Sequence, residues 1–373
     1  MNLWKLNPWA LVVCFGISAG QAQEDTPDVL VCEADELREA GAYADAYMAY
    51  ELAYPYYESV CDYYHMAYVK TWASEMSYYL PYPDEVRDAA VFKAYSIIEE
   101  HLAAVRDTLS YYPLALMNMS LYFGHKKDYE RKLSFCHKAK DAALLINGYR
   151  SHNASTAYNN LGVAYGGRGN WSQALNFLDT SLSISLELGR RADIFYAKNN
   201  IAHIYAELGD FERAILTQEE AVEAANEDRN LARALNNLGA LYVEVDEWET
   251  GILHLKNALA IRRRLSDTLT DNIFSTQLNL IWAYSESGKA RRSEALLDEV
   301  IDEAIALAPS FSNSAYLQIA YNYKARNVLE AGHAAEALNW VGKAEEVSSW
   351  SAESWAGTKL VKGKILQALG RTE

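Results

Sequence analysis

The stretch YNNLGVAYGGRGNWSQAL, at residues 158–175, recurs three more times along the chain. The later copies are KNNIAHIYAELGDFERAI at 198–215, LNNLGALYVEVDEWETGI at 235–252 and the looser LNLIWAYSESGKARRSEA at 278–295. Their aligned asparagines, Asn160, Asn200, Asn237 and Asn279, are spaced 40, 37 and 42 residues apart. A repeat of this length predicts a repeated structural unit, because a catalytic motif has no reason to recur at a fixed period.

The residue types within one copy predict a helix hairpin. Leu161 and Tyr165 are four residues apart, so they share one face of a first helix. Gly169 can end that helix, because glycine adopts the positive φ of a helix cap. Trp171 and Ala174 then begin the buried face of a second, antiparallel helix. One hairpin cannot bury its apolar stripe alone, so we predict hairpins stacked into an all-α solenoid.

The same residues resemble the tetratricopeptide repeat (TPR) family. The pattern Leu161-Gly162-x-x-Tyr165, with Gly169 and Ala174, matches that family over about residues 112–340. The period exceeds the usual value of about 34 residues, so the chain looks more like the long-helix members, such as kinesin light chains and bacterial peptide-sensing receptors. The resemblance implies an all-α fold, a right-handed superhelical solenoid of antiparallel helix hairpins with a concave groove.

We predict four segments along the chain. They are a signal peptide at 1–22, a degenerate Tyr-rich helical region at 23–111, a TPR array at 112–340 and capping helices at 341–373.

The Tyr-rich region has tyrosines at helical spacing. Tyr43, Tyr47, Tyr50 and Tyr54 form one stripe with spacing 4-3-4. One interpretation is a row of core aromatics whose hydroxyls reach the surface. The alternative is an aromatic face that binds a sugar or a Pro-rich peptide.

The N-terminus has the features of a secretory signal peptide. A single early Lys5 precedes an apolar run from about Trp9 to Ala19, which is too short to span a bilayer. The small-x-small sequence Gly20-Gln21-Ala22 predicts cleavage after Ala22. We therefore expect a periplasmic or secreted protein. No other segment approaches 18 consecutive apolar residues, so we expect no direct membrane insertion.

Three cysteines follow the predicted cleavage site: Cys32, Cys61 and Cys136. In an oxidising compartment Cys32 and Cys61 could form a disulfide, because each lies near the start of a predicted helix and successive parallel helices would bring those starts together. The alternative is three buried thiols. The eight histidines form no HExxH motif and no CxxC is present, so we expect no metal site and no cofactor.

The net charge of −16 disfavours nucleic acid as a partner, because phosphate binding needs clustered Lys and Arg. The charge is explained by solubility or, alternatively, by a preference for basic partners. Neither GxSxG nor a P-loop occurs, and the glycine-rich 162–171 follows a predicted helix rather than a strand. We therefore expect no catalytic residues and no enzymatic activity.

The resemblance places the repeated asparagines on the wall of the groove. The candidate groove residues are Asn160, Tyr196, Asn200, His203, Glu207, Arg233, Asn237, Glu244, Asn279 and Trp282. A side-chain amide can donate to a peptide C=O and accept from its N–H at the same time. Alternatively, the amides bond neighbouring helices and hold the stack together. For the preceding residues Asn159, Asn199 and Asn236 we favour this architectural role.

The acidic row Glu207, Glu244 and Glu286 favours a neutral or basic segment in the groove. The hypothesis is therefore a non-catalytic exported scaffold that binds a peptide or protein. The alternative is a periplasmic sensory or regulatory accessory protein that acts through a separate membrane signalling partner.

Overall fold

The computed structural model describes residues 26–78, 80, 84–265, 270–288, 290–306, 311–347 and 352–370. Within these ranges every regular element is a helix and there is no strand. The predicted all-α solenoid of antiparallel hairpins is confirmed. The predicted signal peptide at 1–22 lies outside the described residues. Throughout the described ranges, no helix combines the length and apolarity needed to cross a membrane.

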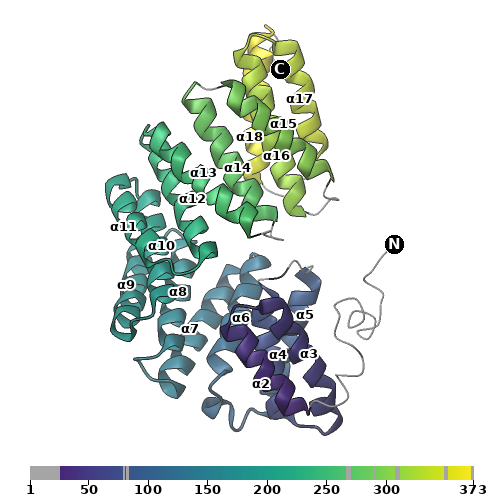
Figure 1. Ribbon diagram of the computed structural model, residues 1–373, viewed down its shortest axis with the longest axis vertical. Helices are drawn as coiled ribbons and strands as arrows, with labels where there is room; N and C mark the ends of the chain where they lie inside the picture. The colour runs from purple at the N-terminus through teal and green to yellow at the C-terminus, as the bar shows by residue number, and fades with distance from the viewer. Residues whose placement is uncertain are drawn as a thin grey trace. The chain divides into compact units, whose positions relative to one another are not determined.

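The chain divides into two compact units, the first of which ends at Asn170. Its helices are α2 (Pro27–Glu39), α3 (Tyr43–Ser59), α4 (Tyr63–Ser77), α5 (Asp84–His101), the 3₁₀ turn η2 (Arg106–Thr108), α6 (Tyr112–His125), α7 (Tyr129–Ile146) and α8 (His152–Gly166). Consecutive helices pack against each other, so the predicted Tyr-rich region is itself built from hairpins (Figure 1).

The second unit begins at Trp171. Its helices are α9 (Trp171–Leu188), α10 (Arg191–Glu207), α11 (Phe211–Ala224), α12 (Asp228–Glu244), α13 (Trp248–Arg264), α14 (Thr270–Glu286), α15 (Ala290–Ala306), α16 (Phe311–Glu330), α17 (Ala334–Glu346) and α18 (Ala352–Ala368). The first helices of successive hairpins also meet, α10 with α12 and α12 with α14. The unit boundary falls within the predicted array.

Each hairpin turn contains the predicted left-handed residue. Nine positions after the repeated asparagine, φ is 74° at Gly169, 74° at Gly209, 64° at Asp246 and 71° at Gly288. Lys127 has φ 57° at the same position of the degenerate copy before 158. In each turn, the backbone therefore ends the first helix in the conformation that the repeated glycine predicted.

The tyrosines of the first unit are mainly core residues. Tyr50 and Tyr54 of the predicted stripe are buried on α3, and so is Tyr57, whereas Tyr43 and Tyr47 are partly buried. The hydroxyl of Tyr57 donates to Asp28 at 2.7 Å, and that of Tyr54 to Glu58 at 3.0 Å. This confirms the core interpretation for the three buried side chains, since their rings are buried and their hydroxyls have carboxylate partners.

The predicted disulfide is wrong in this structure, where Cys32 and Cys61 are free and exposed. The hydrogen bond from Tyr57 to Asp28 joins the last part of α3 to the first part of the antiparallel helix α2. Cys32 lies four residues from Asp28 toward the hairpin turn, and Cys61 four residues past Tyr57 in the opposite direction. Cys32 therefore lies within α2, whereas Cys61 lies in the turn beyond Ser59, the last residue of α3. The buried-thiol alternative holds for Cys136 alone.

Candidate functional site

A cavity of about 480 Å³ opens between α10 and α12 in the second unit. Its lining residues are Asn199, Asn200, Ala202, His203, Ala206, Glu207, Phe211, Gln218, Asn237, Ala240, Leu241 and Glu244. The predicted groove residues Asn200, His203, Glu207, Asn237 and Glu244 are all among them. The structure thus brings together predicted residues from two neighbouring copies of the repeat.

Small side chains create the space in this cavity. Three residues after the repeated asparagine, the second copy has His203, the third Ala240 and the fourth Trp282. Ala202 and Ala206 on α10 and Ala240 on α12 all line the cavity. The larger apolar side chains of Phe211 and Leu241 complete the lining. The cavity therefore has apolar walls between its polar groups.

A network of side-chain amides crosses the cavity wall. Asn237 Nδ2 donates to Asn199 Oδ1 at 2.9 Å, joining α12 to α10. Asn236 Nδ2 donates to Asn237 Oδ1 at 3.2 Å. On α14, Asn279 Nδ2 donates to Asn236 Oδ1 at 3.1 Å. Asn199 and Asn236 thus occupy the architectural positions that the sequence predicted for them.

Asn237 retains capacity for a ligand. An amide nitrogen carries two hydrogens and an amide oxygen has two lone pairs. Asn237 uses one hydrogen toward Asn199 and one lone pair toward Asn236. Among the residues that the structure describes, one donor and one acceptor of Asn237 have no further partner.

The charged groups of the cavity are acidic. Glu207 and Glu244 are exposed at its edge, and neither Lys nor Arg is among the described residues that line it. Glu207 lies 4.0 Å from the imidazole of His203. Glu286, the third acid of the predicted row, forms an ion pair of 2.6 Å with Arg326 and does not line the cavity.

The other predicted residues lie outside the cavity. Asn160 is on α8 of the first unit. The guanidinium of Arg233 lies 5.8 Å from the centroid of the Tyr196 ring. Asn279 contributes through Asn236, and Trp282 packs partly buried against the cluster that contains Leu255.

Asn118 shows that the asparagine position can be purely architectural. It is the counterpart of Asn160 in the degenerate upstream copy and is 1% exposed. Its Nδ2 donates to Thr71 O at 3.3 Å and to Ser74 Oγ at 2.8 Å, joining α6 to α4. The architectural interpretation of the asparagines therefore applies to this copy.

Sequence reasoning missed Gln218, a buried residue of α11 in the cavity wall. Its Nε2 donates to Asn199 Oδ1 at 3.3 Å and to Ala234 O at 3.2 Å. The signal was present in the repeat, because a glutamine interrupts the apolar stripe formed by Ala214 and Ala221.

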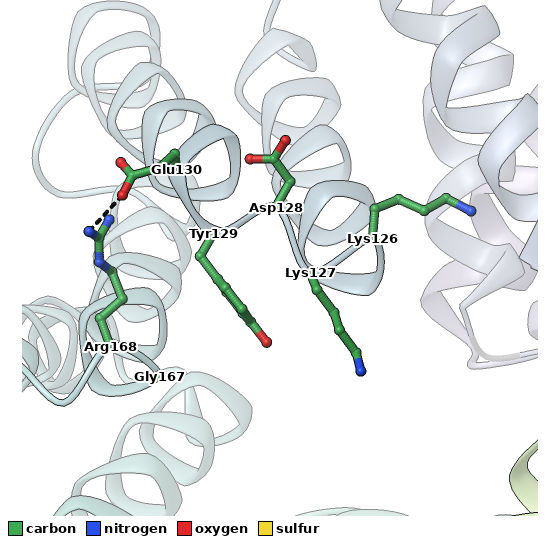
Figure 2. A pocket seen from close by; sticks show the side chains of 7 residues that line it. All are labelled: Lys126, Lys127, Asp128, Tyr129, Glu130, Gly167 and Arg168. Atoms are coloured by element: carbon green, nitrogen blue, oxygen red, sulfur yellow. Dashed lines mark hydrogen bonds and ion pairs between the residues drawn. The ribbon is translucent and has the colours of Figure 1, made fainter. Parts of the chain in front are cut away.

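A larger depression of about 750 Å³ lies in the first unit, at the turns before α7 and after α8. Figure 2 shows its lining residues, Lys126, Lys127, Asp128, Tyr129, Glu130, Gly167 and Arg168. Most of its charge is already compensated: Arg168 pairs with Glu130 at 2.7 Å and Lys126 with Asp88 at 2.7 Å. In Figure 2 the two lysines point in different directions. The convergent polar groups of a binding site are better provided by the cavity between α10 and α12.

The family model described as tetratricopeptide repeat matches residues 155–188 and 231–268. These segments contain the copies at residues 158–175 and 235–252. No curated protein matches the chain significantly. The tetratricopeptide repeat is thus matched in these two segments of the chain.

Several solved structures share the fold. A Rap protein complexed with Competence and Sporulation Factor has a TM-score of 0.61 at 14% identity, covering 92% of this chain and 99% of that one. NprR in complex with its cognate peptide NprX has a TM-score of 0.57 at 18% identity, covering 92% and 98%. The apo form of the quorum sensor NprR from B. thuringiensis has a TM-score of 0.51 at 15% identity, covering 87% and 99%. At these identities the likeness establishes the helical-repeat fold.

Proposed function

We propose that this chain is a non-catalytic scaffold that binds an extended peptide or protein segment in the cavity between α10 and α12. The observation that carries the proposal is that five predicted groove residues, from two copies of the repeat, line one cavity. Solved structures of the same fold include NprR with its cognate peptide NprX and a Rap protein with Competence and Sporulation Factor.

The amides supply a means of holding a main chain. An extended segment presents alternating N–H and C=O groups, and Asn237 has one donor and one acceptor to offer. Asn200 lines the cavity from α10. Each such hydrogen bond contributes about 0.5–1.5 kcal/mol net, so a few of them matter together.

The charges favour a neutral or basic segment. A lysine or arginine side chain could place its apolar stem along Ala206, Ala240 and Phe211 and its cationic head near Glu207 and Glu244. An acidic side chain there would face two carboxylates without a compensating cation among the described lining residues.

A random library of peptides of about seven residues, about 23 Å long when extended, tests this proposal. We expect the wild-type protein to enrich peptides with Lys or Arg, and the Ala240→Trp variant to lose them. The added indole fills the cavity, and the equivalent position of the next copy already holds Trp282. If no peptide is enriched, or if both proteins bind the enriched peptides equally, the proposal is contradicted.

The dissociation constant of an enriched peptide then tests the charge preference. In the Glu207→Gln/Glu244→Gln double variant each lost exposed charge contributes about 0.2–1 kcal/mol, so we expect binding to weaken by about fivefold. Glu212→Gln is the matched control, because this exposed acid of α11 does not line the cavity. Equal affinities for the double variant and the control would exclude a role for these carboxylates.

A second variant addresses the asparagines. Asn200→Ala/Asn237→Ala should abolish binding of the enriched peptide. If helicity and melting temperature are nearly unchanged, the two amides act mainly in binding. If the variant unfolds instead, the asparagines are architecture.

We also propose that the chain is exported, with cleavage after Ala22. The charge, apolar run and small residues of 1–22 support this. Sequencing the N-terminus of the mature protein checks it; a retained Met1 in the cell interior would contradict export.

A further inference from the structure

Gln218 stands at a position where the other copies bury leucine. Eighteen residues after the repeated asparagine the chain has Leu178, Gln218, Leu255 and Leu297. All four side chains are buried, Gln218 being 1% exposed. A polar group in such a position needs hydrogen-bond partners, and the carboxamide of Gln218 has them in both neighbouring first helices.

The Ala234 carbonyl fixes the direction of the whole amide network. A carbonyl can only accept, so Gln218 must turn Nε2 toward it. The same Nε2 also donates to Asn199, whose Oδ1 must therefore face Gln218. Asn237 must then present Nδ2 to that oxygen, which leaves its Oδ1 on the side of Asn236.

The side-chain amide of Asn237 therefore has a fixed orientation along the groove, with its donor and its acceptor pointing toward different helices. Its Nδ2 lies toward Asn199 on α10. Its Oδ1 lies toward Asn236, whose own oxygen is bonded to Asn279 on α14. The donor edge of Asn237 thus faces α10, and the acceptor edge faces the side of α14.

We propose that this relay, set by Gln218, fixes the direction of the bound segment, with its N-terminal end toward α14 and its C-terminal end toward α10. In an extended residue the N–H and C=O point to the same side, and the N–H comes first along the chain. Pairing with Asn237 places the N–H at Oδ1, on the α14 side, and the C=O at Nδ2, on the α10 side. The inference rests on the proposed binding of an extended segment in this cavity.

Gln218 is a positioning residue in this scheme, and Gln218→Leu removes its donors while keeping a side chain that three other copies accommodate. In the free protein we expect hydrogen exchange of the Asn237 side-chain amide, followed by NMR with ¹⁵N-labelled asparagine, to speed up by about fivefold or more, the factor for one lost net hydrogen bond. Gln318→Leu is the matched control, because this buried glutamine donates to Ala344 O at 3.1 Å and does not line the cavity. Unchanged exchange at Asn237 in Gln218→Leu would overturn the positioning role.

The direction is tested with a peptide enriched from the random library on the wild-type protein. A photo-crosslinking group is attached to its N-terminus in one sample and to its C-terminus in another. We expect the N-terminal group to label α14 and the C-terminal group to label α10, and Gln218→Leu to weaken binding by about fivefold, the effect of one net hydrogen bond. The opposite labelling pattern overturns the direction while leaving the proposed function intact. If the library yields no binding peptide, the proposed function and the direction fall together.

Discussion

Gly239 on α12 and Gly251 on α13 touch backbone to backbone. A Cβ added at Gly239 would lie 2.9 Å from the carbonyl oxygen of Gly251 and 2.7 Å from Leu255 Cγ. A Cβ added at Gly251 would lie 2.8 Å from the Gly239 oxygen. Only glycine at both positions lets the helices approach this closely, and α12 carries the amides of the proposed groove.

Gly239→Ala should therefore destabilise the protein. The methyl group meets backbone that cannot move alone, so we expect a loss of about 1–3 kcal/mol in the free energy of unfolding. Denaturant titration measures the change.

Gly342→Ala provides the matched control. Gly342 is also helical, on α17, and a Cβ there would meet nothing within 4 Å. We expect this variant to gain about 0.5–1 kcal/mol, since alanine is the better helix former. If both variants change stability equally, close packing at Gly239 is not the cause.

Asp246→Gly should stabilise the second unit. Asp246 has φ 64°, where the other regular copies have glycine. A left-handed residue with a Cβ costs about 1–2 kcal/mol, and aspartate tolerates this conformation better than most residues, so we expect a gain toward the lower end. Thermal unfolding measures it.

The reverse exchange checks the reason. Gly209→Ala places a Cβ at φ 74° in a turn with nothing else within 4 Å. It should lose about 1 kcal/mol through backbone strain alone. A neutral Gly209→Ala would show that turn conformation does not limit stability.

Alkaline pH should destabilise the first unit. Burial, and then the hydrogen bond to Asp35, raises the pKa of the Tyr50 hydroxyl above its usual value. Burial and the charge of Asp35 do the same for the pKa of Tyr68. The folded state thus holds these protons more tightly than the unfolded state. Stability is fully present below about pH 10 and is lost above it, by at most about 1.4 kcal/mol per pH unit for each hydroxyl.

Tyr50→Phe separates this effect from general alkaline damage. Unfolding free energies at about pH 8 and about pH 11, on either side of the usual tyrosine pKa, should differ less for Tyr50→Phe than for the wild type. Tyr149→Phe, at an exposed tyrosine, should behave like the wild type. A wild-type protein equally stable at both pH values would refute the prediction.

Thiol labelling should distinguish the three described cysteines. Cys32 and Cys61 are exposed and free, whereas Cys136 is buried and its Sγ donates to the main-chain carbonyl oxygen of Asn160 at 3.8 Å. Burial also raises the pKa of Cys136, which lowers its thiolate fraction. We expect iodoacetamide to modify Cys32 and Cys61 in the folded protein and Cys136 only after unfolding. Protection of Cys32 and Cys61 that reductant removes would instead show a disulfide.

The hairpin array could be read from the sequence because its signals are local. Leu161 and Tyr165 share a helix face by spacing alone, and Gly169 marks the turn that follows. Each signal recurs at the same offset in several copies, and this recurrence supports one structural interpretation for all of them. The resemblance to the repeat family predicted Asn200, His203 and Glu207 on the groove wall, and all three line the cavity.

The tertiary structure decided how those faces meet. The cavity is lined by small side chains from two helices, Ala202 and Ala206 on α10 and Ala240 on α12, which only the packing of those helices brings together. The disulfide prediction for Cys32 and Cys61 was wrong because their separation depends on which parts of α2 and α3 lie side by side. Spacing along one helix does not contain that information.

By itself, the sequence determined the helices, their turns and the recurrence of asparagine at the same position of each regular copy, because backbone conformation and helix periodicity are local properties. The three-dimensional packing decided which amides bond each other and which keep a free donor and acceptor. Gln218 reaches Asn199 and the Ala234 carbonyl only after α10, α11 and α12 have packed. A hydrogen bond between separate helices depends on their relative height and rotation, which only the folded stack fixes.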